Sequence, residues 1–239
     1  MKKITMGTMI SQCIANACTE PMKNPFPTEY NWQERHNAII AECKKRAPDM
    51  IFIGDSITHY FGGRPVDDIV RGGEVWEQYY APRNPVNMGC GWDRTQHMLW
   101  RLDNGCLDNI NPRLALVLAG TNNVLWEDSS AEDIAEGVRQ ISVRISNKLP
   151  DTKILLSGIL PFGEASECEK RSRIREINRI VSGFADNKNI FFVDAGAGFM
   201  NTDGNLKKEL FVDGLHPNCD GYSLYAKTIE PTVALLLKK

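Results

Sequence analysis

The side chains best suited to chemistry lie in two short segments at opposite ends of the chain. Near residue 50, the apolar run 50–53 leads into a Gly-Asp-Ser sequence that ends at Ser56. Near the C-terminus, Asp213 stands three residues before His216. A serine hydroxyl becomes nucleophilic when a neighbouring base takes its proton, and a carboxylate can hold that base in the required tautomer. The pattern therefore predicts nucleophilic hydrolysis, with Ser56 attacking, His216 as the base and Asp213 as its orienter.

Each of these residues also has a plain structural explanation. A Gly-Asp-Ser sequence after a strand is a common way to turn into a helix, with Asp55 or Ser56 as the cap. An Asp-x-x-His sequence often arises by chance. The histidines other than His216 have no acidic partner at that spacing, although His59 follows Ser56 closely enough to line a pocket.

Two further segments could stabilise negative charge on a substrate oxygen. Asn122, followed by Asn123, comes directly after an apolar run, and its amide can donate a hydrogen bond at any working pH. Segment 87–93 contains glycines, among them Gly91, that permit close approach of the backbone, and Trp92 follows. In both places an ordinary turn between a strand and a helix is the alternative interpretation.

Short apolar runs and helical patterns must bring these residues together. Runs that are apolar throughout indicate strands buried on both faces, which helices between them cover. Ligands bind at the carboxyl ends of such strands, where Ser56, Asn122 and segment 87–93 fall. We therefore predict an α/β fold with three layers and a doubly wound, mostly five-stranded parallel sheet. The predicted strands are 50–54, 84–88, 114–118, 154–160 and 190–193, and helical patterns cover 32–43, 98–102, 134–145, 174–184 and 222–236.

Size and composition are those of one soluble α/β domain. The chain has 239 residues, of which 42% are hydrophobic and 24% charged. A net charge of −2 gives no reason to expect nucleic-acid binding, and no apolar run is long enough to span a membrane. Prolines interrupt residues 1–30, so we predict an irregular N-terminal segment and a single domain over 31–239.

The N-terminus and the cysteines give weaker indications. Residues 1–17 loosely imitate a signal peptide, but polar side chains interrupt their apolar stretch. A cytoplasmic protein is therefore favoured, and export stays open. The seven cysteines include no Cys-x-x-Cys pair, so neither a zinc site nor a disulfide framework is expected. Asp93 is predicted to cap the helix that follows it, with Gln96 at the capping-box position.

In this order, the motifs resemble those of the SGNH (GDSL-like) hydrolase family. Ser56 ends its first block, Asn122 lies in its third, and Asp213 and His216 form its last. The run 97–105 is similar to the catalytic subunits of platelet-activating factor acetylhydrolases within that family, and Pro161-Phe162-Gly163-Glu164 adds to the likeness. The resemblance covers about residues 32–237 and implies a flavodoxin-like fold.

The resemblance also implies a role for each residue. Ser56 is the nucleophile, His216 the general base and Asp213 its orienter, and no cofactor is needed. The oxyanion hole is formed by the N–H of Ser56, the side chain of Asn122 and a backbone N–H from the second block. At that third position the family usually has glycine and this chain has Trp92, a departure that narrows the allowed backbone angles.

Asp55, His59, Gly91 and Asn123 complete the predicted site as pocket residues. The expected substrate is a small ester, with an acetyl group on a carbohydrate or another small alcohol as the first choice. A lipid esterase similar to platelet-activating factor acetylhydrolases or lysophospholipases is the alternative. A subunit with mainly a protein-interaction role, a homodimer and a sugar-binding module without turnover also stay open.

Overall fold

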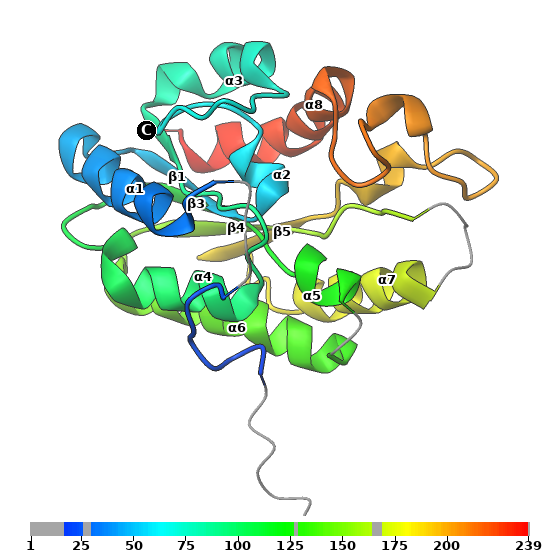
Figure 1. Cartoon of the computed structure of the whole chain (residues 1–239), viewed down its shortest axis with the longest axis horizontal. Helices are drawn as coiled ribbons and strands as arrows, with labels where there is room; N and C mark the ends of the chain where they lie inside the picture. Colours follow the sequence, from blue (N-terminus) through cyan, green and yellow to red (C-terminus); the bar gives the residue numbers. More distant parts are fainter. Residues whose placement is uncertain (1–16, 26–29, 127–128, 164–168, 239) are drawn as a thin grey trace, which may run out of the picture.

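A computed structural model describes residues 17–25, 30–126, 129–163 and 169–238 (Figure 1). The signal-like segment, apart from Ala17, lies outside these residues, as do Cys13, Cys168 and Glu164. Residues 17–25 contain turns and irregular backbone. Within the described ranges, no helix combines the length and the apolar character needed to cross a membrane.

The centre of the fold is a parallel sheet of five strands in the order β2-β1-β3-β4-β5. Phe52 on β1 pairs with Asn87 on one side and with Leu116 on the other. This order is the flavodoxin-like one, in which the switch point lies between β1 and β3. The predicted fold class is confirmed. The strands are β1 Met50–Gly54, β2 Pro85–Asn87, β3 Leu114–Leu118, β4 Lys153–Ser157 and β5 Ile190–Val193.

Two predicted strands are shorter in the structure. β2 covers only Pro85–Asn87 of the predicted 84–88, because Asn84 has a left-handed backbone with a φ of +47°. The run 154–160 was expected to be extended throughout, but β4 ends at Ser157. The side chain of Asn178 then accepts a hydrogen bond from the N–H of Ile159 (2.8 Å) and donates one to its carbonyl (3.0 Å). Because a side chain satisfies both backbone groups, Ile159 needs no neighbouring strand.

Helices cover both faces of the sheet (Figure 1). α1, α4, α6 and α7 pack on one face, and α2, α3 and α8 on the other. The helices are α1 Trp32–Arg46, α2 Ser56–His59, α3 Gly73–Tyr79, α4 Thr95–Arg101, α5 Thr121–Leu125, α6 Ala131–Lys148, α7 Glu169–Ser182 and α8 Cys219–Leu236, with short 3-10 turns η2 Ala81–Arg83, η4 Gly196–Phe199 and η5 Lys208–Leu210 and a π segment η3 Leu102–Cys106.

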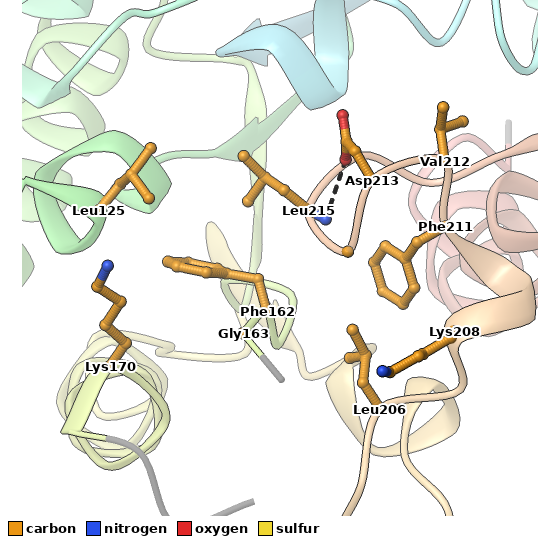
Figure 2. A pocket seen from close by; sticks show the side chains of 11 residues that line it. Leu125, Phe162, Gly163, Lys170, Leu206, Lys208, Phe211, Val212, Asp213 and Leu215 are labelled. Carbon is orange, nitrogen blue, oxygen red and sulfur yellow. Dashed lines mark hydrogen bonds between the residues drawn. The ribbon is translucent and has the colours of Figure 1, made fainter. Parts of the chain in front are cut away.

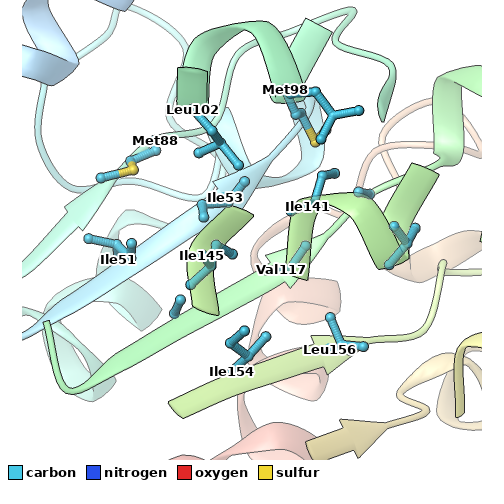
Figure 3. Close-up of a cluster of buried hydrophobic side chains, with 14 of the residues drawn as sticks. Ile51, Ile53, Met88, Met98, Leu102, Val117, Ile141, Ile145, Ile154 and Leu156 are labelled. Carbon is cyan, nitrogen blue, oxygen red and sulfur yellow. The ribbon is translucent and has the colours of Figure 1, made fainter. Parts of the chain in front are cut away.

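The two faces of the sheet have different cores. Ile51 and Ile53 point to the face of α4 and α6, where aliphatic side chains predominate (Figure 3). Phe52 points to the opposite face, where it contacts the rings of Trp76 and Tyr80. Burial of each such side chain contributes roughly 1.5–3 kcal/mol. This double cover explains why β1 and β3 carry no polar side chain at any position, and it holds the carboxyl ends of both strands in a fixed frame.

Candidate active site

Ser56, His216 and Asp213 form a chain of hydrogen bonds at the carboxyl end of the sheet. Ser56 is the first residue of α2, one residue beyond the end of β1, and His216 lies on the loop before α8. The Oγ of Ser56 is 2.8 Å from Nε2 of His216, and Nδ1 of His216 is 2.7 Å from Oδ2 of Asp213. Residues 160 positions apart therefore meet as the sequence predicts.

The loop itself holds the carboxylate in place. Oδ1 of Asp213 accepts hydrogen bonds from the N–H groups of Leu215 (3.1 Å) and His216 (2.8 Å). An antiparallel bridge between Phe211 and Pro217 closes the base of the loop. Partial burial raises the pKa of Asp213, but its hydrogen bonds with His216 outweigh that effect and hold the pKa below its usual value. The carboxylate therefore stays ionised.

This arrangement selects one tautomer of His216. Ionised Asp213 can only accept a hydrogen bond, so Nδ1 of His216 carries the proton. Nε2 then has a free electron pair directed at the hydroxyl of Ser56. A neutral imidazole in this form can take a proton from Oγ.

Asn122 lies in α5, the short helix that follows the carboxyl end of β3. The helix begins after Gly120, whose φ of +112° is readily adopted only without a side chain. A Cβ there would also lie 2.8 Å from Cδ1 of Ile159. The Nδ2 of Asn122 donates one hydrogen bond to the carbonyl of Asp93 (2.9 Å), and an amide has a second hydrogen to donate.

Trp92 departs from the expected glycine and keeps the glycine conformation. Its φ is +66°, in the left-handed region that a bulky residue rarely adopts. Strain of this kind is on the order of 1–3 kcal/mol and persists where the surrounding structure determines the backbone. The indole packs against Trp126 at 6.2 Å between ring centroids.

Ser56 opens into a hollow of about 270 Å³, here called the serine hollow. Asp55, His59, Gly91 and Asn123, the four predicted pocket residues, do not line it. The residues that line it are Ser56, Tyr60, Ile69, Arg71, Trp92, Asn122, Leu125, Asp213, Leu215 and His216.

Those four residues instead hold the surrounding backbone. Asp55 accepts from the N–H of Ile57 (2.9 Å), and its complete burial raises its pKa to about 7. The side chain of Asn123 accepts from the N–H of Thr95 (3.0 Å). His59 and Gly91 hydrogen-bond to each other.

Asp93, the residue that follows Trp92, forms a buried ion pair with Arg101. The carboxylate of Asp93 accepts from Nε of Arg101 (2.7 Å) and from Nε1 of Trp32 (2.7 Å). The prediction that Asp93 caps α4 is therefore wrong, because α4 begins after Arg94 and the carboxylate is turned inward to the guanidinium. Breaking such a pair typically costs 3–5 kcal/mol.

Asn87 is a site-supporting residue that sequence reasoning missed. Its Nδ2 donates to the carbonyls of Thr58 (2.7 Å) and Gly62 (2.6 Å), and its Oδ1 accepts from the N–H of Gly89 (2.8 Å). It therefore ties the segment after Ser56 to the loop before Trp92. Its position at the end of β2 is the signal that could have identified it, because polar residues at the carboxyl ends of parallel strands lie at the edge of the sheet where ligands bind.

A larger hollow of about 450 Å³ adjoins the serine hollow, with Leu125, Asp213 and Leu215 in the walls of both (Figure 2). Its remaining walls are largely apolar, with Lys170 and Lys208 at its margin. Across the described ranges, no group of three or more His, Cys, Asp or Glu side chains is arranged to hold a metal ion.

The order of the segments that carry Ser56, Asn122 and His216 along the chain matches one protein family. A model of the GDSL-like lipase/acylhydrolase family aligns with residues 52–224. The chain belongs to this family. As a GDSL-like acylhydrolase it is a carboxylic ester hydrolase.

Relatives of this GDSL-like hydrolase support the same assignment. It is 31% identical over 209 residues to the human platelet-activating factor acetylhydrolase IB subunit alpha2, covering 87% of this chain and 86% of that protein. It is 29% identical over 223 residues to the human alpha1 subunit, covering 91% of each.

Solved structures share its fold at lower identity. A GDSL-like lipase of Bacteroides thetaiotaomicron superposes with a TM-score of 0.67 at 17% identity, covering 87% of this chain and 98% of that one. An acetylxylan esterase of Geobacillus stearothermophilus superposes with a TM-score of 0.62 at 18% identity, covering 80% and 94%.

Proposed function

We propose that this protein is a serine esterase that removes a short acyl group, acetyl first, from a carbohydrate or another small alcohol. The observation that carries the proposal is the contact of 2.8 Å between Oγ of Ser56 and Nε2 of His216, with Asp213 on the far side of the ring. This contact supplies the base that a serine nucleophile requires.

In the first half-reaction the enzyme is acylated. Nε2 of His216 takes the hydroxyl proton as Oγ of Ser56 bonds to the ester carbonyl carbon. The N–H groups of Ser56 and Trp92 and the amide of Asn122 stabilise the oxyanion that forms. The bond from carbon to the leaving oxygen then breaks, and protonated His216 gives its proton to the departing alcohol.

In the second half-reaction water takes the place of the alcohol. His216 accepts a proton from water as its oxygen bonds to the acyl carbon, and a second tetrahedral oxyanion forms. When the bond from that carbon to Oγ breaks, His216 returns the proton to Ser56. The products are the free acid and the starting enzyme.

The size of the serine hollow supports a short acyl chain. Its volume of about 270 Å³ lies just below the 300–1,000 Å³ typical of pockets for drug-sized ligands. The side chains of Trp92 and Leu215 lie in its wall and limit the space beyond Ser56. An acetyl ester needs little of that space.

A lipid acetyl ester is a second candidate, and two observations favour it. The relatives at 29–31% identity are subunits of platelet-activating factor acetylhydrolases. The adjoining hollow also offers apolar walls, including Phe162, Leu206 and Phe211, to a longer alcohol. The two candidates share the acetyl group and differ in the alcohol. A homodimer stays a prediction that a mass measurement in solution can test.

The test of the mechanism is covalent trapping. A fluorophosphonate should label the wild-type chain once, and peptide mapping should find the label on Ser56. Ser56→Ala should give neither label nor hydrolysis. Labelling at another residue, or turnover by Ser56→Ala at the wild-type rate, would overturn the proposal.

The test of the acyl group is a series of p-nitrophenyl esters from acetate to octanoate. We expect kcat/KM to be highest for acetate and to fall with chain length. A maximum at octanoate would exclude the acetyl preference. Acetylated xylo-oligosaccharide and an acetylated ether phospholipid, compared at equal concentration, then distinguish the two alcohols.

A further inference from the structure

The loop that carries Trp92 is held by side chains that do not line the serine hollow. Gly91 precedes Trp92, and both of its backbone polar groups bind side chains from elsewhere in the chain. Its N–H donates to Nδ1 of His59 (3.2 Å), and its carbonyl accepts from the hydroxyl of Tyr30 (2.9 Å). The two rings are in edge contact with each other, with 4.9 Å between their centroids.

The contact with Tyr30 acts on the peptide unit that matters for the oxyanion. The carbonyl of Gly91 and the N–H of Trp92 belong to one planar trans peptide, so they point in opposite directions. A hydroxyl that fixes the carbonyl on one side therefore fixes the direction of the N–H on the other. Burial raises the pKa of Tyr30, so its hydroxyl keeps the proton that it donates.

The contact with His59 fixes the other side of Gly91. A backbone N–H can only donate, so Nδ1 of His59 is the acceptor and the ring proton is on Nε2. Nε2 in turn lies 2.8 Å from Oδ2 of Asp67, which completes a second His–Asp pair. The side chain of His59 is fully buried, while that of Asp67 is 22% exposed.

Arg35 connects this pair to the start of the loop. Its Nε donates to the carbonyl of Gly89 (2.6 Å), and its Nη1 lies 3.4 Å from Oδ2 of Asp67. Asp67 is thus joined to Gly89 through Arg35 and to Gly91 through His59. The loop is held at both of its glycines by groups that converge on one carboxylate.

Glycine at 91 is part of this arrangement. A Cβ there would lie 3.3 Å from Cε1 of Tyr30, tighter than most such contacts. The absence of a side chain therefore lets the hydroxyl of Tyr30 reach the backbone. The hydrogen bonds to both backbone groups of Gly91 also account for the left-handed backbone of Trp92, because they fix the orientation of the peptide that precedes it.

We propose that Tyr30 and His59 are positioning residues that aim the N–H of Trp92 at the oxyanion formed during ester hydrolysis. This inference rests on the proposed function, because it assumes that Ser56 attacks an ester. Neither residue lines the serine hollow, and both act through the Gly91–Trp92 peptide.

Three variants separate the contacts. Tyr30→Phe removes one hydroxyl and leaves the ring. His59→Asn keeps an oxygen near the place of Nδ1 and can still accept from Gly91, whereas His59→Gln keeps a donor near the place of Nε2 and serves only Asp67. We expect kcat to fall about five- to tenfold for Tyr30→Phe and His59→Gln with KM within twofold, and by less than threefold for His59→Asn.

A trifluoromethyl ketone gives a readout that a purely structural role would not move. Its adduct with Ser56 carries an oxyanion, so its affinity should fall by the same factor as kcat. Matched controls are Tyr80→Phe, whose buried hydroxyl has no hydrogen-bond partner among the described residues, and His36→Gln, a buried histidine on α1. Both should keep wild-type kcat and inhibitor affinity.

The outcomes distinguish this inference from the proposed function. If wild-type protein is not labelled at Ser56 by a fluorophosphonate, the proposed function fails. If Ser56 is labelled and hydrolysis occurs, but Tyr30→Phe and His59→Gln keep wild-type kcat and ketone affinity, the positioning role is wrong. Equal losses in His59→Asn and His59→Gln would also contradict it, since only one of them lacks the acceptor for Gly91.

Discussion

Among the described residues, two His–Asp pairs share their chemistry and differ in their surroundings. His216 and Asp213 lie on an open loop, where the carboxylate is 44% exposed and the imidazole faces the hydroxyl of Ser56. His59 and Asp67 do not line the serine hollow, and the imidazole of His59 is fully buried and faces a backbone N–H. A hydroxyl can give up a proton to its partner and an amide cannot, so only the first pair can act as a base.

Electrostatics strengthens this contrast. Burial, followed by the nearby charge of Arg35, lowers the pKa of His59 to about 3. Its ring therefore stays neutral at physiological pH and serves as a fixed link, while Asp67 stays ionised beside Arg35. The comparison indicates that the partner of the histidine, and its access to water, decide whether the pair does chemistry or supports it.

The largest expected effect comes from changing the two aspartates in the same way. Asp213→Asn should lower kcat by about 10⁴-fold with little change in Tm, because the amide favours the wrong tautomer of His216. Asp67→Asn should lower kcat by less than tenfold and destabilise the fold by about 1–3 kcal/mol, since it leaves the buried Arg35 without its counter-charge. Steady-state kinetics and thermal denaturation of both variants measure the difference, and similar losses of activity would remove the distinction between the pairs.

Removal of Asn122 should have the next largest effect. Asn122→Ala deletes a donor to the oxyanion, so we expect kcat to fall by about 10²–10³-fold with KM nearly unchanged. The amide also donates to the carbonyl of Asp93, and Asn122→Asp, which keeps the shape and cannot donate, tests whether donation is the cause. Activity of Asn122→Asp near the wild-type level would show that this side chain does not stabilise the oxyanion.

A smaller effect is expected from giving the loop the glycine that the family usually has. Trp92→Gly removes a wall of the serine hollow and relieves the left-handed strain, while leaving the backbone N–H in place. Acetate hydrolysis should stay within about tenfold of wild type. The ratio of hexanoate to acetate turnover should rise by about tenfold, because one changed contact in a pocket wall is typically worth about 1–3 kcal/mol. An unchanged ratio would show that Trp92 does not limit the acyl chain.

At neutral pH the smallest expected effect is that of protonating His59, which appears as a loss of stability only in acid. Because the pKa of His59 is lower in the folded chain than the unfolded value of about 6.5, the unfolded state binds more protons below pH 6.5 and stability is lost as pH falls toward 3. His36 and His97 act in the same direction. Relative to His59→Gln, the wild type should lose up to about 1.4 kcal/mol per pH unit below pH 6, measured by urea denaturation. A difference that stays constant with pH would contradict a neutral, buried His59.

The sequence predicted what depends on local patterns. Short segments between the helical patterns identified all five strands. The carboxyl-end rule placed Ser56 and Asn122 at one edge of the sheet, where His216 lines the same hollow. It did not reveal the partners of Asp93 or His59, because Arg101 and Gly91 are specified only by three-dimensional packing. Local patterns alone therefore indicate a cap at Asp93 and a pocket residue at His59, and the structure shows neither.

Tyr30 shows the same limit. It follows a proline-rich segment that carries no periodic pattern, so nothing in its neighbourhood indicates a contact with the backbone 61 positions away. The two short motifs could be found because each has its reactive groups within three residues. A network assembled from α1, α2 and the loop after β2 has no such local signature.

α2 is a single turn, and the residues at its two ends belong to the two different histidine systems. Ser56 begins the turn and His59 ends it. A small rotation of this turn would therefore move the hydroxyl of Ser56 and the imidazole that holds Gly91 at the same time. Substitutions at Ile57 or Thr58, which lie between them, would therefore change both nucleophilic attack by Ser56 and stabilisation of the oxyanion. Substitutions at Tyr30 or Asn122 would change oxyanion stabilisation without moving Ser56.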